Sequence, residues 1–344
     1  MLEDFCLTRL SFTVNPQEKI LLPRYKGSTL RGGFGHAFKK VNCVAKGDSC
    51  EDCILTDNCL YNYVFNTPLP EDSEMMKKYP YAPHPFLIEP PEEEKREYER
   101  GDRIEFGLVL IGKVLKQLPY FVYAFQKLGE LGLGKGRGEY EVERVEFSPL
   151  KGDGESHIVY GCGGGDGEAE SNDGKEGLRE WKEWIRFPEL NSNNFNVSEK
   201  FTINLRTPLR VKYQGSLVND LQFHILFRNL LRRTSLLSFF HCEQEMEVDF
   251  EGLIEAAKRV EKVEDETEWY DWKRFSGRQQ KWIKMGGIVG KATFNTEQLD
   301  EEMEENFTSL LRLGEYIHVG KSTAFGMGRY ELGRKKETDA LAVD

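Results

Sequence analysis

One short, glycine-containing segment of the chain concentrates a histidine, a phenol and several cations. Residues 25–40 read YKGSTLRGGFGHAFKK and include His36, Lys39 and Lys40. A histidine titrates near neutral pH and can transfer a proton, and a lysine or arginine can neutralise a phosphate. His36 and Lys40 are four residues apart, so on a helix they would share one face. Because a single histidine is more often structural, spacing alone leaves a catalytic role for His36 open.

A cluster of four cysteines follows this segment, with the spacing Cys43-x6-Cys50-x2-Cys53-x5-Cys59. Two cysteines separated by two residues present both thiolates to one ion, and two further cysteines can complete a tetrahedral shell. The pattern predicts structural zinc, with an iron–sulfur cluster or unligated cysteines as the alternatives. Four thiolates leave no open position for water, so we expect a metal here to organise a loop rather than to catalyse. The isolated Cys6, Cys162 and Cys242 are expected to be packing or surface residues.

Two glycine-rich basic loops occupy equivalent places in the two halves of the chain. Residues 132–138 read GLGKGRG and residues 320–328 read GKSTAFGMG; each follows an apolar helical stretch and leads into an alternating strand. Glycines allow successive N–H groups to converge on an anion; the alternative for each loop is a turn without a ligand, and this alternative is stronger for the first loop. The first loop is followed by acids and is expected to be mainly a structural turn. The second is the stronger candidate for phosphate binding, through Lys321, Ser322, Thr323 and Arg329.

Two further basic clusters lie in the second half. One is a predicted helix with Arg228, Arg232 and Arg233, and the other is the segment 273–284, KRFSGRQQKWIK. The segment interleaves aromatic and basic residues, which suits a surface for phosphates and unstacked RNA bases. The alternative is that these cations pair with neighbouring acidic runs. The binding interpretation assigns RNA contacts in the segment to Lys273, Arg274, Arg278 and Lys281.

Bulk composition sets limits on these interpretations. The chain has 344 residues, a net charge of −11 and 39% hydrophobic residues, which fits two domains of ordinary size. The negative charge means that a nucleic-acid site must be a local patch. The first residues carry acids where a signal peptide would carry bases, and no apolar run is long enough to cross a bilayer. We therefore expect a soluble, cytoplasmic protein without membrane contacts.

The order of predicted elements is the same in both halves. Each half is expected to contain strand, helix, strand, strand, helix and strand, in that order. In the first half these elements are near 7–14, 26–41, 85–89, 103–112, 114–128 and 140–147. In the second half they are near 201–213, 222–239, 269–275, 283–294, 299–313 and 330–332, with an acidic helical insertion at 250–263. This predicts an α+β fold of tandem ferredoxin-like (RRM-like) βαββαβ domains. The boundaries are 1–149 for the N-terminal domain, with a cysteine-rich metal-binding insertion at 42–60; 150–196 for an acidic, glycine-rich linker with a short helix at 181–187; 197–335 for the C-terminal domain; and 336–344 for a tail.

Taken together, these pieces resemble a known family. The chain is similar to the CRISPR-associated endoribonucleases of the RAMP superfamily, which cut precursor CRISPR RNA within its repeats. The matching pieces are GSTLRGGFGH at 27–36 with the cysteines after it, HPF at 84–86 through PP at 90–91, the 132–138 loop, TPLR at 207–210, LRR at 231–233, WKRFSGRQ at 272–279 and HVGKSTAFGMG at 318–328. The last of these is the most recognisable mark of the family.

The resemblance implies two ferredoxin-like domains and RNA as the partner. It implies metal-independent cleavage, in which the ribose 2′-hydroxyl attacks the adjacent phosphate and leaves a 2′,3′-cyclic phosphate and a 5′-hydroxyl. His36 matches the histidine that the first helix often supplies, with Tyr25, Lys39 and Lys40 as helpers and Arg31 as an RNA contact. The cysteine cluster occurs in some branches only. The alternative is a catalytically inactive RAMP subunit that binds CRISPR RNA beside other effector subunits.

Overall fold

The computed structural model describes residues 5–45, 50, 52–69, 76, 81–147, 157–161, 197, 200–276 and 280–334. The chain divides into two compact units. Unit 1 comprises 1–192, 235–246 and 324–326, and unit 2 comprises 193–234, 247–323 and 327–344. Most of the predicted linker, the short helix predicted within it and the predicted tail lie outside the described residues.

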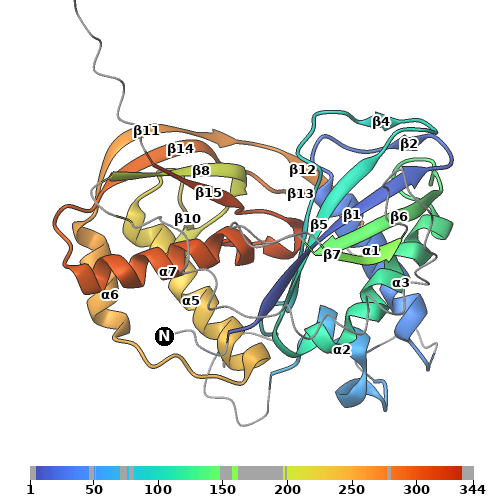
Figure 1. Ribbon diagram of the computed structural model, residues 1–344, viewed down its shortest axis with the longest axis horizontal. Coiled ribbons are helices and arrows are strands. Elements are labelled where there is room, and N and C mark those ends of the chain that lie inside the picture. The colour runs from blue at the N-terminus through green and yellow to red at the C-terminus, as the bar shows by residue number, and fades with distance from the viewer. Residues whose placement is uncertain are drawn as a thin grey trace, which may run out of the picture. The chain divides into compact units, whose positions relative to one another are not determined.

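Unit 1 contains a five-stranded antiparallel sheet with the order β3-β5-β1-β6-β7 (Figure 1). The two main helices, α1 and α3, follow β1 and β5 in the chain. The principal elements are β1 (Leu7–Pro16), α1 (Gly27–Asn42), β3 (Phe86–Glu89), β5 (Ile104–Ile111), α3 (Leu118–Leu131), β6 (Tyr140–Phe147) and β7 (His157–Gly161). Short elements are β2 (Ile20–Leu21), η1 (Thr56–Asn58), α2 (Leu60–Phe65), β4 (Glu97–Tyr98) and η2 (Gly112–Gln117).

An aromatic cluster fills the core of unit 1. Phe34 of α1 and Phe12 of β1 both pack against Phe125 of α3, with ring centroids 4.6 and 4.7 Å apart from it. Leu30, Phe34 and Phe38 recur every four residues on α1 and are fully buried, so one stripe of the helix faces the sheet. Burial of each such side chain stabilises the folded state by roughly 1.5–3 kcal/mol. This burial keeps the opposite stripe of α1 toward solvent.

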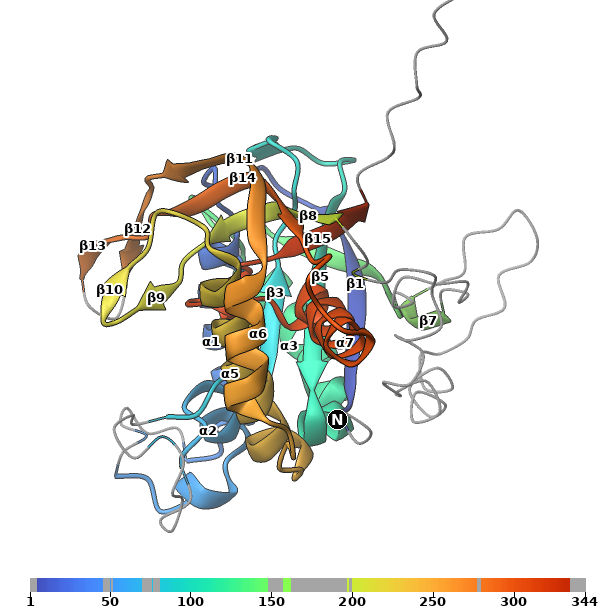
Figure 2. The same ribbon diagram turned by 90° about the vertical axis from the view of Figure 1, so that its left-hand side faces the viewer.

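Unit 2 contains a four-stranded antiparallel sheet with the order β11-β14-β8-β15, and α5 and α7 cover one of its faces (Figures 1 and 2). Phe223 of α5 packs against Phe294 of β14 and against Phe307 of α7. The elements are β8 (Lys200–Leu209), β9 (Lys212–Tyr213), β10 (Ser216–Leu217), α5 (Phe223–Cys242), α6 (Phe250–Arg259), β11 (Glu261–Tyr270), β12 (Lys273–Ser276), β13 (Lys281–Lys284), β14 (Gly287–Asn295), α7 (Glu301–Ile317), η5 (Thr323–Phe325) and β15 (Tyr330–Arg334). From Ser235 onward α5 belongs to unit 1.

Both units show the element order that the sequence predicts. When the four main strands of each sheet are numbered along the chain, their order across the sheet is second, third, first and fourth. One helix follows the first strand and another follows the third. This mixed α/β arrangement of antiparallel sheets fits the split βαβ of a ferredoxin-like domain.

One prediction in unit 2 is wrong. The acidic insertion is not helical through residue 263, because α6 ends at Arg259 and the acidic run 261–270 forms the edge strand β11. Its side chains are mostly exposed, and charged side chains protect an exposed edge from pairing with another chain. The predicted strand at 269–275 is interrupted between β11 and β12, and that at 283–294 between β13 and β14.

Candidate functional site

Helix α1 presents His36 on its solvent-facing stripe. His36 and Lys40 are exposed and Lys39 is partly exposed, opposite the buried Phe34 and Phe38. Gly33 allows α1 to approach α3 closely, since a Cβ at this position would lie 2.8 Å from the Leu128 side chain. The end of α3 and the loop that follows it are therefore held near the outer stripe of α1.

The first glycine loop, residues 132–138, begins where α3 ends. Gly132, Gly134 and Gly136 have φ values of 78°, 77° and 94°, which favour glycine. The N–H of Lys135 donates to the Leu21 carbonyl at 2.9 Å, and a Cβ at Gly134 would lie 2.3 Å from that same carbonyl oxygen. This close packing fixes the loop while leaving the Lys135 and Arg137 side chains exposed.

The loop contributes a cation to the surroundings of His36. Partial burial, followed by the charges of Lys40, Arg137 and Lys39, lowers the pKa of the His36 imidazole below its ordinary value. Within the part of the chain that the structure describes, no carboxylate forms an ion pair with Lys40 or Arg137. We call His36, Lys39, Lys40 and Arg137 the α1 site. It combines an imidazole that is neutral at pH 7 with positive charge, which suits proton abstraction beside a phosphate.

Sequence reasoning assigned the first loop a structural role and missed Arg137. The available signal was a small residue on α1, Gly33, which allows close packing against α3, together with a basic loop directly after α3. Close helix packing would then have predicted that the loop lies beside α1.

Tyr25 and Arg31 are turned into unit 1 and do not extend the exposed α1 site. Tyr25 Oη donates to the Phe325 carbonyl at 2.8 Å, and burial raises the pKa of this phenol well above its ordinary value. The Arg31 guanidinium lies 4.8 and 5.1 Å from the ring centroids of Phe65 and Phe325. Both side chains therefore hold the segment 324–326 within unit 1, a role that the family resemblance did not suggest.

The second glycine loop, residues 320–328, and Val319 before it use several backbone N–H groups for the local fold. Those of Val319 and Gly328 donate to the carbonyls of Gly328 and Pro208, at 3.0 and 3.1 Å, and that of Lys321 donates to the Arg210 carbonyl at 2.8 Å. These N–H groups do not converge on an open anion site. Thr323 is buried, Ser322 and Arg329 are partly exposed, and Lys321 is exposed.

The predicted basic helix, α5, divides into exposed and buried arginines. Arg228 and Arg232 are exposed, with Arg228 over the Tyr213 ring at 5.8 Å. Arg233 is only 9% exposed; its Nε donates to the Ile317 carbonyl at 2.9 Å, and burial lowers its pKa to about 9. Arg233 therefore supports the interior of unit 2 and does not offer a cation to solvent.

The segment 273–284 forms the hairpin β12–β13, which stands out from the sheet of unit 2 in Figure 2. Its register pairs Phe275 with Trp282 and Lys273 with Lys284, so that these four side chains share one face. Phe275 and Trp282 are 50% and 67% exposed, and their ring centroids are 5.7 Å apart. Lys281 is exposed, Arg274 is half-buried, and Arg278 lies outside the described residues.

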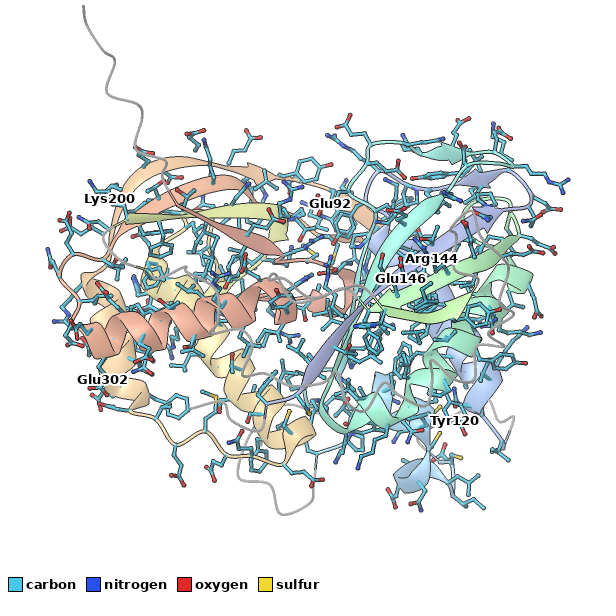
Figure 3. All side chains as sticks on the ribbon, in the orientation of Figure 1. Glu92, Tyr120, Arg144, Glu146, Lys200 and Glu302 are labelled. Carbon is cyan, nitrogen blue, oxygen red and sulfur yellow. The ribbon has the colours of Figure 1, made fainter. Side chains whose placement is uncertain are left out.

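Two other arginines of unit 1, Arg103 and Arg144, are paired with carboxylates. On β6, Arg144 forms an ion pair with Glu146 at 3.1 Å, and the two side chains are labelled in Figure 3. Glu143 accepts two hydrogen bonds from Arg103, at 2.7 and 3.0 Å. Glu143 and Glu146 thus pair with Arg103 and Arg144, whereas Lys40 and Arg137 of the α1 site form no ion pair among the described residues.

The four clustered cysteines line one pocket between α1 and α2, and all are partly exposed free thiols. Among the described residues, no three His, Cys, Asp or Glu side chains are already arranged closely enough to hold a metal ion. In the same residues no helix is long and apolar enough to span a membrane.

Two protein-family models and one relative match this chain. Residues 203–330 match the family model described as CRISPR-associated endoribonuclease Cas6, and residues 5–172 match a model described only as an N-terminal domain. An uncharacterized protein of Archaeoglobus fulgidus is 24% identical over 316 residues, which cover 90% of this chain and 92% of that protein.

Solved structures show the same likeness. A Cas6 product complex has a TM-score of 0.57 at 15% identity, with 95% of this chain and 100% of that chain covered. Thermus thermophilus Cas6 has a TM-score of 0.54 at 13% identity, with 96% and 99% covered. Another Cas6 product complex has a TM-score of 0.52 at 17% identity, with 96% and 100% covered.

The chain therefore shares the fold of these Cas6 structures. Residues 203–330 match the Cas6 family model, and the resemblance to repeat-processing endoribonucleases predicted from the sequence is confirmed.

Proposed function

We propose that this protein binds CRISPR repeat RNA and cleaves it at the α1 site without a catalytic metal. The observation that carries the proposal is the exposed His36 imidazole, whose pKa is lowered partly by Lys40 and Arg137. A neutral imidazole accepts a proton, and neighbouring cations stabilise the charge that develops on a phosphate under attack.

The proposed reaction is an internal transfer. His36 removes the proton of a ribose 2′-hydroxyl, and the oxygen attacks the adjacent phosphorus. The bond from phosphorus to the 5′-oxygen breaks, and that oxygen takes up a proton. The products are a 2′,3′-cyclic phosphate and a 5′-hydroxyl. Lys40 and Arg137 would neutralise the phosphorane, with Lys39 adding charge from the same helix.

RNA binding is supported by a second surface, on the hairpin of unit 2. Phe275 and Trp282 offer exposed aromatic faces to unstacked bases, and Lys273 and Lys284 flank them to bind phosphates. Arg228, Arg232 and Lys321 are further exposed cations of unit 2 that could contact the backbone. These contacts would serve a catalytic protein or an inactive RNA-binding subunit equally well. Only the α1 site distinguishes the two functions.

The experiment is incubation of the purified protein with repeat RNA from its own genome in EDTA. The expected result is cleavage at one position, with a 2′,3′-cyclic phosphate that resists 3′-end ligation until acid opens the ring and a phosphatase removes the resulting monophosphate. RNA in which the 2′-hydroxyl at that position is replaced by hydrogen should bind but remain uncut. Tight binding without cleavage of any native repeat would instead favour the inactive subunit, with other effector proteins as its partners.

A further inference from the structure

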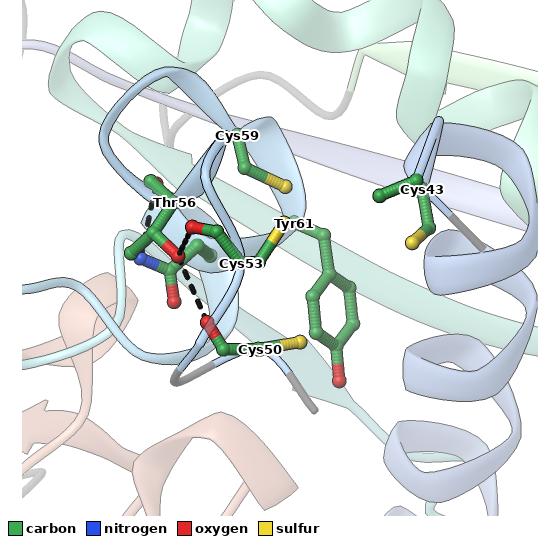
Figure 4. Close-up of a pocket in the computed structure, with 8 residues that line it drawn as sticks. Cys43, Cys50, Cys53, Thr56, Cys59 and Tyr61 are labelled. Atoms are coloured by element: carbon green, nitrogen blue, oxygen red, sulfur yellow. Dashed lines mark hydrogen bonds between the residues drawn. The ribbon is translucent and has the colours of Figure 1, made fainter. Parts of the chain in front are cut away.

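The cysteine loop between α1 and α2 brings four thiols to one pocket. Cys43 comes from the end of α1, and Cys50, Cys53 and Cys59 come from the turn that precedes α2. In Figure 4 the sulfur atoms of Cys50, Cys53 and Cys59 point toward the side of the pocket on which Cys43 lies. Four cysteines spread over residues 43–59 thus line the same pocket.

The turn that carries three of the cysteines is already ordered by hydrogen bonds. Thr56 Oγ1 donates to the carbonyls of Cys50 and Cys53, at 2.8 and 2.7 Å (Figure 4). The N–H of Thr56 donates to the Cys53 carbonyl at 3.0 Å, and that of Cys59 to the Thr56 carbonyl at 3.3 Å. Cys43 is fixed separately, because its N–H donates to the Lys39 carbonyl at 2.8 Å and ends α1. These bonds hold the backbone at the four cysteines, and the thiol side chains remain to be brought together.

We propose that Cys43, Cys50, Cys53 and Cys59 bind one structural zinc ion. Soft thiolate donors select zinc or an iron–sulfur cluster over hard cations, and two cysteines separated by two residues are typical of zinc knuckles. Binding releases the four thiol protons and leaves a tetrahedral centre with a charge of −2. The thiols must rotate inward to reach the tetrahedral spacing, since no three of them hold it in the described structure. Metal binding supplies the driving force for that convergence.

The centre would connect mechanically to the helix that carries His36. Tyr61 lines the same pocket and stacks on Phe65 with ring centroids 5.0 Å apart. Phe65 packs on Phe34 and Phe38 of α1, at 5.7 and 5.8 Å. Lys39 Nζ lies 5.9 Å from the Tyr61 ring centroid. Zinc would thus hold α2 against α1 and fix the last turn of α1, without taking part in chemistry.

The first test is metal analysis of the full-length protein as purified without chelator. We expect about one zinc per chain, and four of the seven cysteines should resist a thiol reagent until the metal is removed. Replacement by cobalt(II) should give the visible and thiolate charge-transfer bands of a tetrahedral sulfur site. Zinc far below one per chain with all thiols reactive, iron-to-sulfur absorption bands, or a disulfide among the four would each overturn the proposal.

Single substitutions localise the metal. Cys53→Ser should lose zinc, whereas Cys6→Ser and Cys242→Ser, which replace partly exposed cysteines outside the loop, should keep it. If Cys53→Ser does not fold, the cobalt spectrum and thiol protection of the wild-type protein still decide the matter. Zinc retained at full stoichiometry by a folded Cys53→Ser would contradict the assignment. None of these measurements depends on whether the protein cleaves RNA.

Discussion

The two glycine-rich loops have similar sequences and different surfaces. In the first, Gly134 packs under the Leu21 carbonyl and the side chain of Arg137 is left exposed near His36. In the second, the N–H groups of Val319, Lys321 and Gly328 are bound to carbonyls of the chain. Glycine content therefore marks where the backbone must turn tightly. Both loops leave a cation exposed, Arg137 in the first and Lys321 in the second, but only Arg137 is among the charges that lower the pKa of His36.

The largest predicted contrast is between the exposed cations of the two loops. Arg137→Ala should lower the single-turnover cleavage rate roughly 10²-fold, because it removes a charge proposed to stabilise the phosphorane. Lys321→Ala, the matched change in the second loop, should alter that rate by less than about threefold, as expected for an exposed surface cation. Equal losses in the two variants would break the comparison.

A smaller effect is predicted on RNA affinity. Trp282→Ala should weaken repeat binding by about 1–3 kcal/mol, roughly 5- to 150-fold in Kd, because it removes a base-stacking surface. Tyr120→Ala is the control, since Tyr120 is a 48% exposed aromatic residue on α3, outside the hairpin that carries Trp282 (Figure 3). Fluorescence anisotropy with labelled repeat RNA measures both. Unchanged affinity in Trp282→Ala would contradict the assignment of the hairpin to the RNA interface.

The loops should also differ in their tolerance of side chains. Gly328 has a φ of 75°, and a Cβ there would lie 1.9 Å from the Val319 carbonyl oxygen. Gly328→Ala should therefore lower the free energy of unfolding by about 1–3 kcal/mol. Gly136 has a φ of 94° but an added Cβ would meet no atom within 4 Å, so Gly136→Ala should cost less. Thermal unfolding of both variants compares them, and the reverse order would contradict the assignment of the second loop to folding.

The smallest effect concerns the pH dependence of cleavage. A general base works only when deprotonated, so the rate should fall as the pH drops through the pKa of His36. Because Lys40 helps to lower that pKa, Lys40→Gln should raise it and move the acidic limb of the profile to higher pH. The Lys321→Ala profile should keep its midpoint. An acidic limb that stays in place or moves to lower pH in Lys40→Gln would rule out this coupling.

Much of the fold could be predicted because its periodicity is strong. The helix around Phe34 and Phe38 and the strand 140–147 follow directly from apolar spacing. The edge strand β11 could not, because its acidic residues are exposed on both faces and carry no period-two signal. Its strand conformation comes from pairing with β14, which is a tertiary interaction.

The candidate site was predicted only in part, for a related reason. His36, Lys39 and Lys40 share a helix, so local spacing is enough to group them. Arg137 comes from a loop about 100 residues later, and only the packing of α1 on α3 through Gly33 brings it near. Conversely, the sequence of Tyr25 and Arg31 gives no sign that both turn inward to residue Phe325.

The most direct test of the central claim, that cleavage takes place at the α1 site, is the single-turnover rate of His36→Ala on cognate repeat RNA. The control is His224→Ala in unit 2, whose pKa is also lowered, by burial and Lys258, but which lies beside Tyr213. His36→Ala should lose roughly 10²–10⁴-fold in rate while binding RNA normally, and His224→Ala should cleave like the wild type. Cleavage by His36→Ala at the wild-type rate would contradict the account.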